Sequence, residues 1–226
     1  MIIIPIKQTI FASVAFALSH WKKLIEVSIF PLLLVFPFLS LLPELLLNIE
    51  QILAGNSGLP ENYLLYLSLF LYGYSALLVN IYRLVVLGGG AILPLGIVVP
   101  SLRIGRFLLL FLFVSIAPFF PVLAQLPFLI FLVYFFLIPM TLNLVALAND
   151  TPYKKIKLPG RVQFNICLLK YGVPLALSTI LTLDLTVNPV LLYMFLALMI
   201  VISYCVEICC ALCYRVIVAH NSTQNL

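Results

Sequence analysis

Long apolar runs constrain this chain more than any other feature of its sequence. A helix needs about 20 mostly apolar residues to cross roughly 30 Å of hydrocarbon. Six stretches meet this requirement: residues 24–47, 63–87, 104–122, 128–148, 171–187 and 190–218. The runs are continuous, whereas strands of a membrane barrel alternate apolar and polar residues over about 10 positions. The sequence therefore predicts an all-α fold, a polytopic bundle of six transmembrane helices in a single domain that covers residues 1–226.

Charged residues are too scarce for a water-soluble protein. Only 8% of the 226 residues are Asp, Glu, Lys or Arg, and 65% are hydrophobic, whereas soluble domains carry about 25% charged residues. Disorder is excluded as well, because it requires low hydrophobicity and high charge. The residues outside the six runs form no stretch long enough for a separate soluble domain.

The positive residues predict the orientation of the bundle. All 12 Lys and Arg residues lie at or near ends of the runs that would share one side, and the connections 48–62, 123–127 and 188–189 contain none. Positive residues accumulate at the cytoplasmic ends of membrane helices. Six spans with both termini in the cytoplasm satisfy this pattern.

Residues 1–23 allow two interpretations. Apolar residues recur there at the three- and four-residue spacing of one helical face: Ile6, Ile10, Val14, Leu18 and Trp21. This pattern favours an interfacial helix on the inner leaflet, where lysines are attracted to anionic lipid. The alternative is a cleaved signal peptide, with Lys7 in its basic region and a small-x-small site at Ala15-Phe16-Ala17. Polar residues within the apolar stretch weigh against that alternative.

The most polar stretch, residues 149–170, predicts a basic amphipathic segment on the cytoplasmic side. Candidate contacts to anionic headgroups lie there and before the first span: Lys22, Lys23, Lys154, Lys155, Lys157 and Arg161. Nucleic-acid binding is the alternative that a basic segment with aromatic residues suggests. Positive cytoplasmic loops have this composition routinely, so we expect no nucleic-acid partner.

Residues 88–100 are apolar but too short to cross a membrane. The stretch begins with three glycines and contains Pro94 and Pro100. Two placements are open, a re-entrant piece or an interfacial piece packed under the bundle. A phosphate-binding loop is not favoured, because no Lys-Ser or Lys-Thr follows the glycines.

Glu207 is the main candidate for an intramembrane polar site, because it lies near the middle of the last apolar run. A carboxylate at that depth should face the bundle interior, a cavity or a partner, or be protonated. Candidate partners at similar depth are Asn80, Arg83 and Asn143. The functional interpretation is a proton- or cation-coupling site or a lipid-headgroup contact. The structural alternatives are a protonated Glu207 that bonds a neighbouring helix, or a tilted span that brings Glu207 nearer the inner surface.

The cysteines and histidines do not indicate a metal site or a catalytic centre. Four of the five cysteines lie on the last run, and Cys210 and Cys213 have C-x-x-C spacing. One such pair without a second pair of ligands is a weak signal for a metal, and cysteine packs readily between helices. No H-E-x-x-H or G-x-S-x-G motif occurs. We therefore expect no metal, no cofactor and no enzymatic activity.

The order of these features resembles the YciC-type family of bacterial inner-membrane proteins and, more loosely, the membrane domains joined to some glycerophosphodiester phosphodiesterases. The segments that carry the resemblance are Ser19-His20-Trp21-Lys22-Lys23, Gly88-Gly89-Gly90, Arg103-Ile104-Gly105-Arg106, Ile138-Pro139, Asn149-Asp150 and Tyr214-Arg215. The chain departs from the family in lacking a Ser/Arg-rich run after Asp150. The resemblance implies a six-helix protein of the bacterial inner membrane, concerned with envelope or lipid homeostasis, and supplies no catalytic residues.

These sequence features are compatible with two functions. The first is a non-enzymatic integral membrane protein that acts through lipid or partner interaction in envelope homeostasis. Its partners would be anionic headgroups on the cytoplasmic side and a second copy or another membrane protein. The alternative is a small transporter or channel subunit that uses Glu207 within the membrane.

Overall fold

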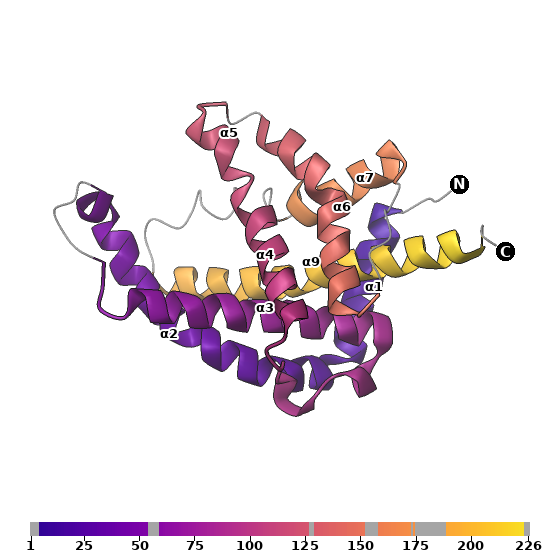
Figure 1. The fold of residues 1–226 in the computed structure, drawn as a ribbon, viewed down its shortest axis with the longest axis horizontal. Helices are drawn as coiled ribbons and strands as arrows, with labels where there is room; N and C mark the ends of the chain where they lie inside the picture. The colour runs from indigo at the N-terminus through magenta and orange to yellow at the C-terminus, as the bar shows by residue number, and fades with distance from the viewer. Residues whose placement is uncertain are drawn as a thin grey trace.

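The computed structural model describes residues 5–53, 59–126, 129–151, 158–172, 174 and 189–223. Helices are the only regular elements among these residues, which confirms the predicted all-α class for the described part of the chain (Figure 1). In chain order they are α1 (Ile6–Ser19), α2 (Trp21–Leu53), α3 (Tyr63–Leu87), the 3-10 turns η1 (Gly89–Ala91) and η2 (Pro94–Gly96), α4 (Leu102–Ile116), α5 (Phe119–Leu123), α6 (Ile130–Ala148), α7 (Gly160–Cys167), the π-helical turn η4 (Leu168–Gly172) and α9 (Pro189–Thr223).

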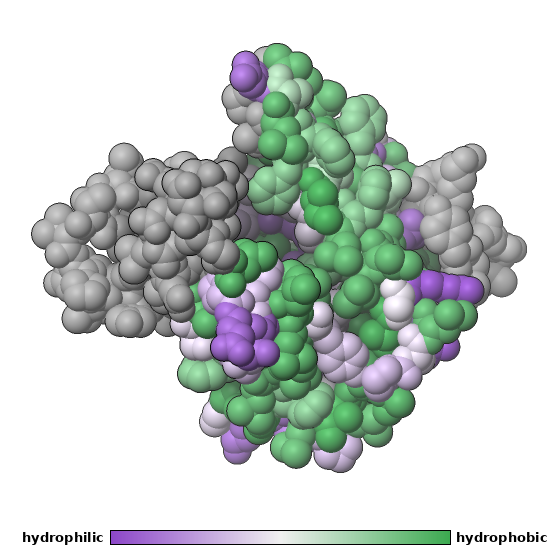
Figure 2. Space-filling model, turned by 60° about the vertical axis from the view of Figure 1, so that its left-hand side comes forward, coloured by the Kyte–Doolittle hydropathy of each residue, from purple (hydrophilic) through white to green (hydrophobic). Residues whose placement is uncertain are grey.

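Five helical stretches are long and apolar enough to cross a membrane: Trp21–Leu41, Tyr63–Leu87, Leu102–Pro121, Ile130–Ala148 and Ile200–His220. They overlap five of the six predicted runs, so the chain is a multi-pass membrane protein. The remaining predicted run, 171–187, lies almost entirely outside the described residues. Apolar side chains also cover most of the described surface on the face shown in Figure 2, and Leu64, Leu102 and Leu123 are 72%, 76% and 78% exposed. Lipid, rather than water, is the solvent that such a surface requires.

The helices form two groups that diverge from a common region. In Figure 1, α2, α3 and α9 run across the view, whereas α4 and α6 rise from them. The two groups meet where α3 contacts α4, α6 and α9. Buried residues concentrate at this junction, and they include Tyr82 on α3, Phe107 on α4, Leu142 on α6 and Ile208 on α9.

Two glycines allow α2 to approach its neighbours closely. A Cβ atom on Gly73 of α3 would lie 2.7 Å from the carbonyl oxygen of Pro31. Gly96 of η2 has a φ of +72°, and a Cβ atom there would lie 1.8 Å from the carbonyl oxygen of Val27. Side chains are therefore excluded at both positions, and the second also requires a backbone conformation that favours glycine.

Residues 88–100 pack against α2 and α3 through the two 3-10 turns. The side-chain amide of Asn80 donates hydrogen bonds to the carbonyl oxygens of Val27, at 3.1 Å, and Gly96, at 2.8 Å. The hydroxyl of Tyr72 donates to the carbonyl oxygen of Val98. The bonds to Gly96 and Val98 satisfy carbonyl groups of a segment that has no regular structure beyond these two turns, as a low-dielectric environment requires.

The N-terminal helix packs differently from the predicted stripe. α1 ends at Ser19, and it packs along α9, where Ser13 is fully buried. Of the predicted apolar face, Ile6 and Ile10 pack against the core, whereas Val14, Leu18 and Trp21 are 40%, 69% and 53% exposed. Each step of four residues rotates about 40° beyond a full helical turn. Residues spaced four apart therefore turn gradually away from α9. Ile6 and Ile10 still face the core, whereas Val14, Leu18 and Trp21 face outward.

The basic segment 149–170 divides into parts with different surroundings. Lys154, Lys155 and Lys157 lie outside the described residues. In α7, Arg161 is exposed, while Gln163 donates a 2.6 Å hydrogen bond to the carbonyl oxygen of Phe135 on α6. Val162, Ile166 and Cys167 are buried. The second half of the segment therefore packs against the helices rather than lying apart on a surface.

Candidate functional site

The candidate site is built around Glu207, whose side chain is 10% exposed. The ammonium nitrogen of Lys170 lies 3.0 Å from each carboxylate oxygen of Glu207, and the hydroxyl of Tyr82 donates to Oε2 at 2.5 Å. A carboxylate with an ion-pair partner and an O–H donor satisfies the condition for burial of a charge. We call these three residues the Glu207 cluster.

Lys170 reaches the cluster from the π-helical turn η4, between buried Leu169 and half-buried Tyr171. Its side chain is 11% exposed, and its ammonium also lies 5.9 Å from the centre of the Tyr171 ring. The sequence predicts that Lys170 belongs to the basic cytoplasmic segment 149–170. The structure instead inserts it among the helices, where Glu207 compensates its charge.

Tyr82 is fully buried on α3 and faces α9. Successive helical residues rotate by about 100°, so Tyr82 lies on nearly the opposite side of α3 from Asn80. That rotation explains why Tyr82 contacts Glu207, while Asn80 bonds Val27 and Gly96 on the other side of α3.

The residues proposed as partners of Glu207 have other surroundings. Arg83 donates from Nε to the carbonyl oxygen of Ala148 at 2.8 Å. Asn143 on α6 is buried, and its Oδ1 has no hydrogen-bond partner among the described residues. Within the described part of the chain, the hydrogen-bond partners of Glu207 are thus Lys170 and Tyr82. Two sequence signals could have indicated them: a lysine flanked by apolar residues, and a phenol in the middle of an apolar helix, which needs a partner.

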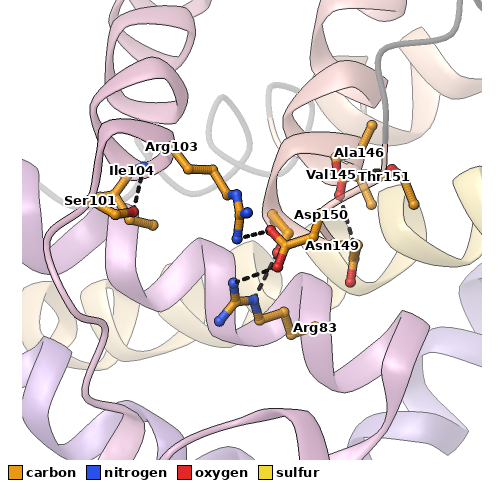
Figure 3. Close-up of polar contacts among 10 residues, drawn as sticks. Arg83, Ser101, Arg103, Ile104, Val145, Ala146, Asn149, Asp150 and Thr151 are labelled. Atoms are coloured by element: carbon orange, nitrogen blue, oxygen red, sulfur yellow. Dashed lines mark hydrogen bonds and ion pairs between the residues drawn. The ribbon is translucent and has the colours of Figure 1, made fainter.

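A second polar cluster joins the two groups of helices. Asp150 follows α6 and lies between Arg83 of α3 and Arg103 of α4 (Figure 3). Its Oδ1 pairs with Arg103, and its Oδ2 lies 3.8 Å from Nη2 of Arg83. Asp150 has a φ of +59°, a conformation that Asp tolerates better than most residues. This arrangement ties together the ends of α3, α4 and α6.

A cavity of about 270 Å³ borders the Glu207 cluster. Glu207, Lys170 and Ser115 contribute polar groups to its wall. Its aromatic lining residues are Tyr74, Tyr82, Phe111, Tyr134 and Tyr171. A second, apolar cavity of about 160 Å³ shares Tyr74, Leu78 and Glu207 with the first. The Glu207 carboxylate therefore stands at the boundary of both cavities.

The cysteines are all free thiols, and four of them are buried. Cys209 lies beside α1, with its sulfur 3.7 Å from the carbonyl oxygen of Thr9. Among the described residues, no three His, Cys, Asp or Glu side chains are grouped closely enough to hold a metal ion.

Comparison with models of known protein families, with curated proteins and with solved structures gives no match. The fold itself defines the class of the protein, which is a multi-pass membrane protein with polar clusters between its helices.

Proposed function

We propose that the protein is a non-enzymatic component of the bacterial inner membrane that acts through binding of lipid and of a membrane partner in envelope homeostasis. Both termini and the exposed cations face the cytoplasm in this proposal. The order of features shared with the YciC-type family supports it. The partners are anionic headgroups and a second copy of the chain or another membrane protein.

The observation that carries this proposal is a set of exposed cations that form no ion pair among the described residues: Lys7, Lys22, Arg106, Arg161 and Arg215. Residues 59–79 and 107–147 contain no Lys or Arg at all, so most of α3 and α4 and all of α6 carry no positive charge. A cation near an anionic leaflet contributes about 1 kcal/mol to binding. A set of unpaired cations beside a lipid-compatible surface therefore favours binding of anionic headgroups.

Native mass spectrometry of the full chain, extracted from vesicles of phosphatidylethanolamine and phosphatidylglycerol, tests the proposal. The test variant carries Lys22→Gln, Arg106→Gln, Arg161→Gln and Arg215→Gln, and we expect it to retain less phosphatidylglycerol than the wild type. A second variant neutralises Lys154, Lys155, Lys157 and Arg161, the segment that the sequence emphasises. The control is Lys23→Gln, because Lys23 is paired with Glu26 at 2.9 Å. Undiminished phosphatidylglycerol retention in both test variants would contradict the proposal.

The alternative function is a small transporter or channel subunit. It is favoured by one observation, the buried Glu207–Lys170 pair beside a cavity, because intramembrane ionisable residues often mark substrate or ion pathways. In vesicles loaded with a pH-sensitive dye, a flux protein should lose ion or proton movement on Glu207→Gln while its oligomeric state is unchanged. A protein that acts only through lipid or partner contacts should show no flux before or after that substitution.

A further inference from the structure

Among the described residues, the charged groups that line the cavity beside the Glu207 cluster use only part of their hydrogen-bonding capacity. A lysine ammonium has three N–H donors, and a carboxylate accepts up to about four hydrogen bonds. Lys170 uses two donors on Glu207, and Glu207 accepts two bonds from Lys170 and one from Tyr82. Both charged groups line the cavity wall. A ligand there would meet one cation and one anion about 3 Å apart.

The neutrality of the pair restricts the charge of any ligand. A net charge left uncompensated in a low-dielectric interior is strongly unfavourable. A simple cation would bind Glu207 at the expense of Lys170, and a simple anion would bind Lys170 at the expense of Glu207. Either would leave the cavity with a net charge. A zwitterion of zero net charge can bind both groups and keep the total at zero.

We propose that this cavity binds a zwitterion whose ammonium group contacts Glu207 and whose phosphodiester or carboxylate group contacts Lys170. The ammonium of the ligand takes lone pairs of Glu207, and the anionic group takes an N–H of Lys170. The aromatic wall suits such a ligand, because rings attract the ammonium through their faces. The volume of about 270 Å³ admits a headgroup-sized molecule.

Two sources supply this chemistry, a zwitterionic lipid headgroup and a free small zwitterion. Lipid is a nearby source of such a headgroup, because Glu207 and Tyr82 both lie in apolar helices long enough to span a membrane. The proposal is independent of the exposed cations that carry the proposed function. Its ligand has no net charge, whereas the exposed cations would select anionic lipid.

The first experiment compares a zwitterion with its two charged halves on the purified full chain in detergent. The soluble probes are glycerophosphoethanolamine, ethanolamine and dimethyl phosphate, and the readout is the increase in thermal midpoint with ligand concentration. The lipid arm measures retention of phosphatidylethanolamine against phosphatidylglycerol by native mass spectrometry. We expect glycerophosphoethanolamine to bind more tightly than either half, or phosphatidylethanolamine to be retained at a site that phosphatidylglycerol does not occupy. The first result indicates a free zwitterion and the second a lipid headgroup.

The second experiment removes the charges without leaving one of them unpaired. Removing both charges of a buried ion pair avoids the cost of leaving one of them unpaired, and Gln at position 207 keeps an acceptor for the Tyr82 hydroxyl, so the double variant Lys170→Met with Glu207→Gln should fold. Because loss of a buried charged contact is costly, we expect it to bind the zwitterion about 30-fold or more weakly. Tyr72→Phe, which changes a hydroxyl remote from the cluster along α3, should retain wild-type binding.

Three outcomes would overturn the proposal. They are measurable binding of glycerophosphoethanolamine that is no tighter than that of one of its halves, unchanged zwitterion binding in the folded double variant, and no binding of either zwitterionic probe to the wild type. Loss of phosphatidylglycerol retention in the exposed-cation variants would be unaffected by any of these results, so a failure here is distinguishable from a failure of the proposed function.

Discussion

Tyr82 and Glu207, 125 positions apart in the chain, form a 2.5 Å hydrogen bond between α3 and α9. The same carboxylate pairs with Lys170, so three elements meet at one buried polar point. The bond is formed on the face of α3 that is turned toward α9. It also explains why a carboxylate can lie within a helix that is otherwise apolar, because its charge is paired and each of its oxygens accepts a hydrogen bond.

The first prediction concerns this bond. We expect Tyr82→Phe to lower the free energy of unfolding by about 1.5–3 kcal/mol, because a hydrogen bond to a charged group is lost and the carboxylate keeps only Lys170. Thermal unfolding in detergent measures the effect. Tyr72→Phe is the matched control, since its hydroxyl donates to the neutral carbonyl oxygen of Val98 and should cost only about 0.5–1.5 kcal/mol. A larger loss in the control than in Tyr82→Phe would contradict the assignment.

The second prediction separates the two arginines that contact Asp150. The Arg103 side chain is 48% exposed, and exposed ion pairs contribute about 0–1 kcal/mol. Arg83 is 22% exposed and donates at 2.8 Å to the carbonyl oxygen of Ala148, the last residue of α6. We therefore expect Arg83→Gln to destabilise the protein by about 1.5–3 kcal/mol and Arg103→Gln by less than about 1 kcal/mol. The unfolding midpoints of the two variants, measured under the same conditions, test this prediction. An equal or larger loss of stability in Arg103→Gln would contradict it.

The third prediction concerns the close approach of Gly96 in η2 to the backbone of α2. Gly96→Ala places a Cβ atom 1.8 Å from the carbonyl oxygen of Val27, at a φ of +72°. The left-handed conformation alone costs about 1–2 kcal/mol, and the clash also forces η2 away from α2. We expect a loss well above that cost, together with a reduced yield of folded protein. Gly90→Ala is the control, because a Cβ atom there meets nothing within 4 Å. If both variants fold equally well, the packing of η2 against α2 is wrong.

The fourth prediction is a pH dependence that arises from Cys167 on α7. Burial raises the pKa of the Cys167 thiol from 9.0 to about 11. Between these values the unfolded chain loses a proton that the folded protein keeps, so stability should fall as the pH rises from about 9 toward 11. We expect the unfolding midpoint of the wild type to fall more steeply over this range than that of Cys167→Ala. Parallel curves for the two proteins would show that Cys167 does not cause the dependence.

The helices could be read from the chain because their signal is local. Apolar runs of sufficient length predict spanning helices at 24–47, 63–87, 104–122, 128–148 and 190–218, and the structure has long apolar helices at each place. Boundaries differ where local chemistry intervenes. α4 ends at Ile116 just before Pro118, which has no N–H to continue the hydrogen-bond ladder. The predicted run at 171–187 stays a prediction.

The surroundings of the candidate residues could not be read in the same way. The sequence indicates Glu207 as an intramembrane polar site and Asn80 as a candidate partner, and in the structure both are hydrogen-bonded, but not to each other. The identity of each partner depends on the rotation of α3, which turns Tyr82 rather than Asn80 toward α9. Neither residue type nor spacing along the chain determines that rotation.

By itself, the sequence determined the solvent of this protein and the position of its long helices, because both follow from the apolar content of consecutive residues. Only the tertiary structure decided that Lys170 pairs with Glu207, that η2 packs on α2 at Gly96, and that Asp150 lies between Arg83 and Arg103. The physical reason is the range of the interactions. Hydrophobicity acts residue by residue, whereas ion pairs and close packing depend on how segments far apart in the chain are placed and turned.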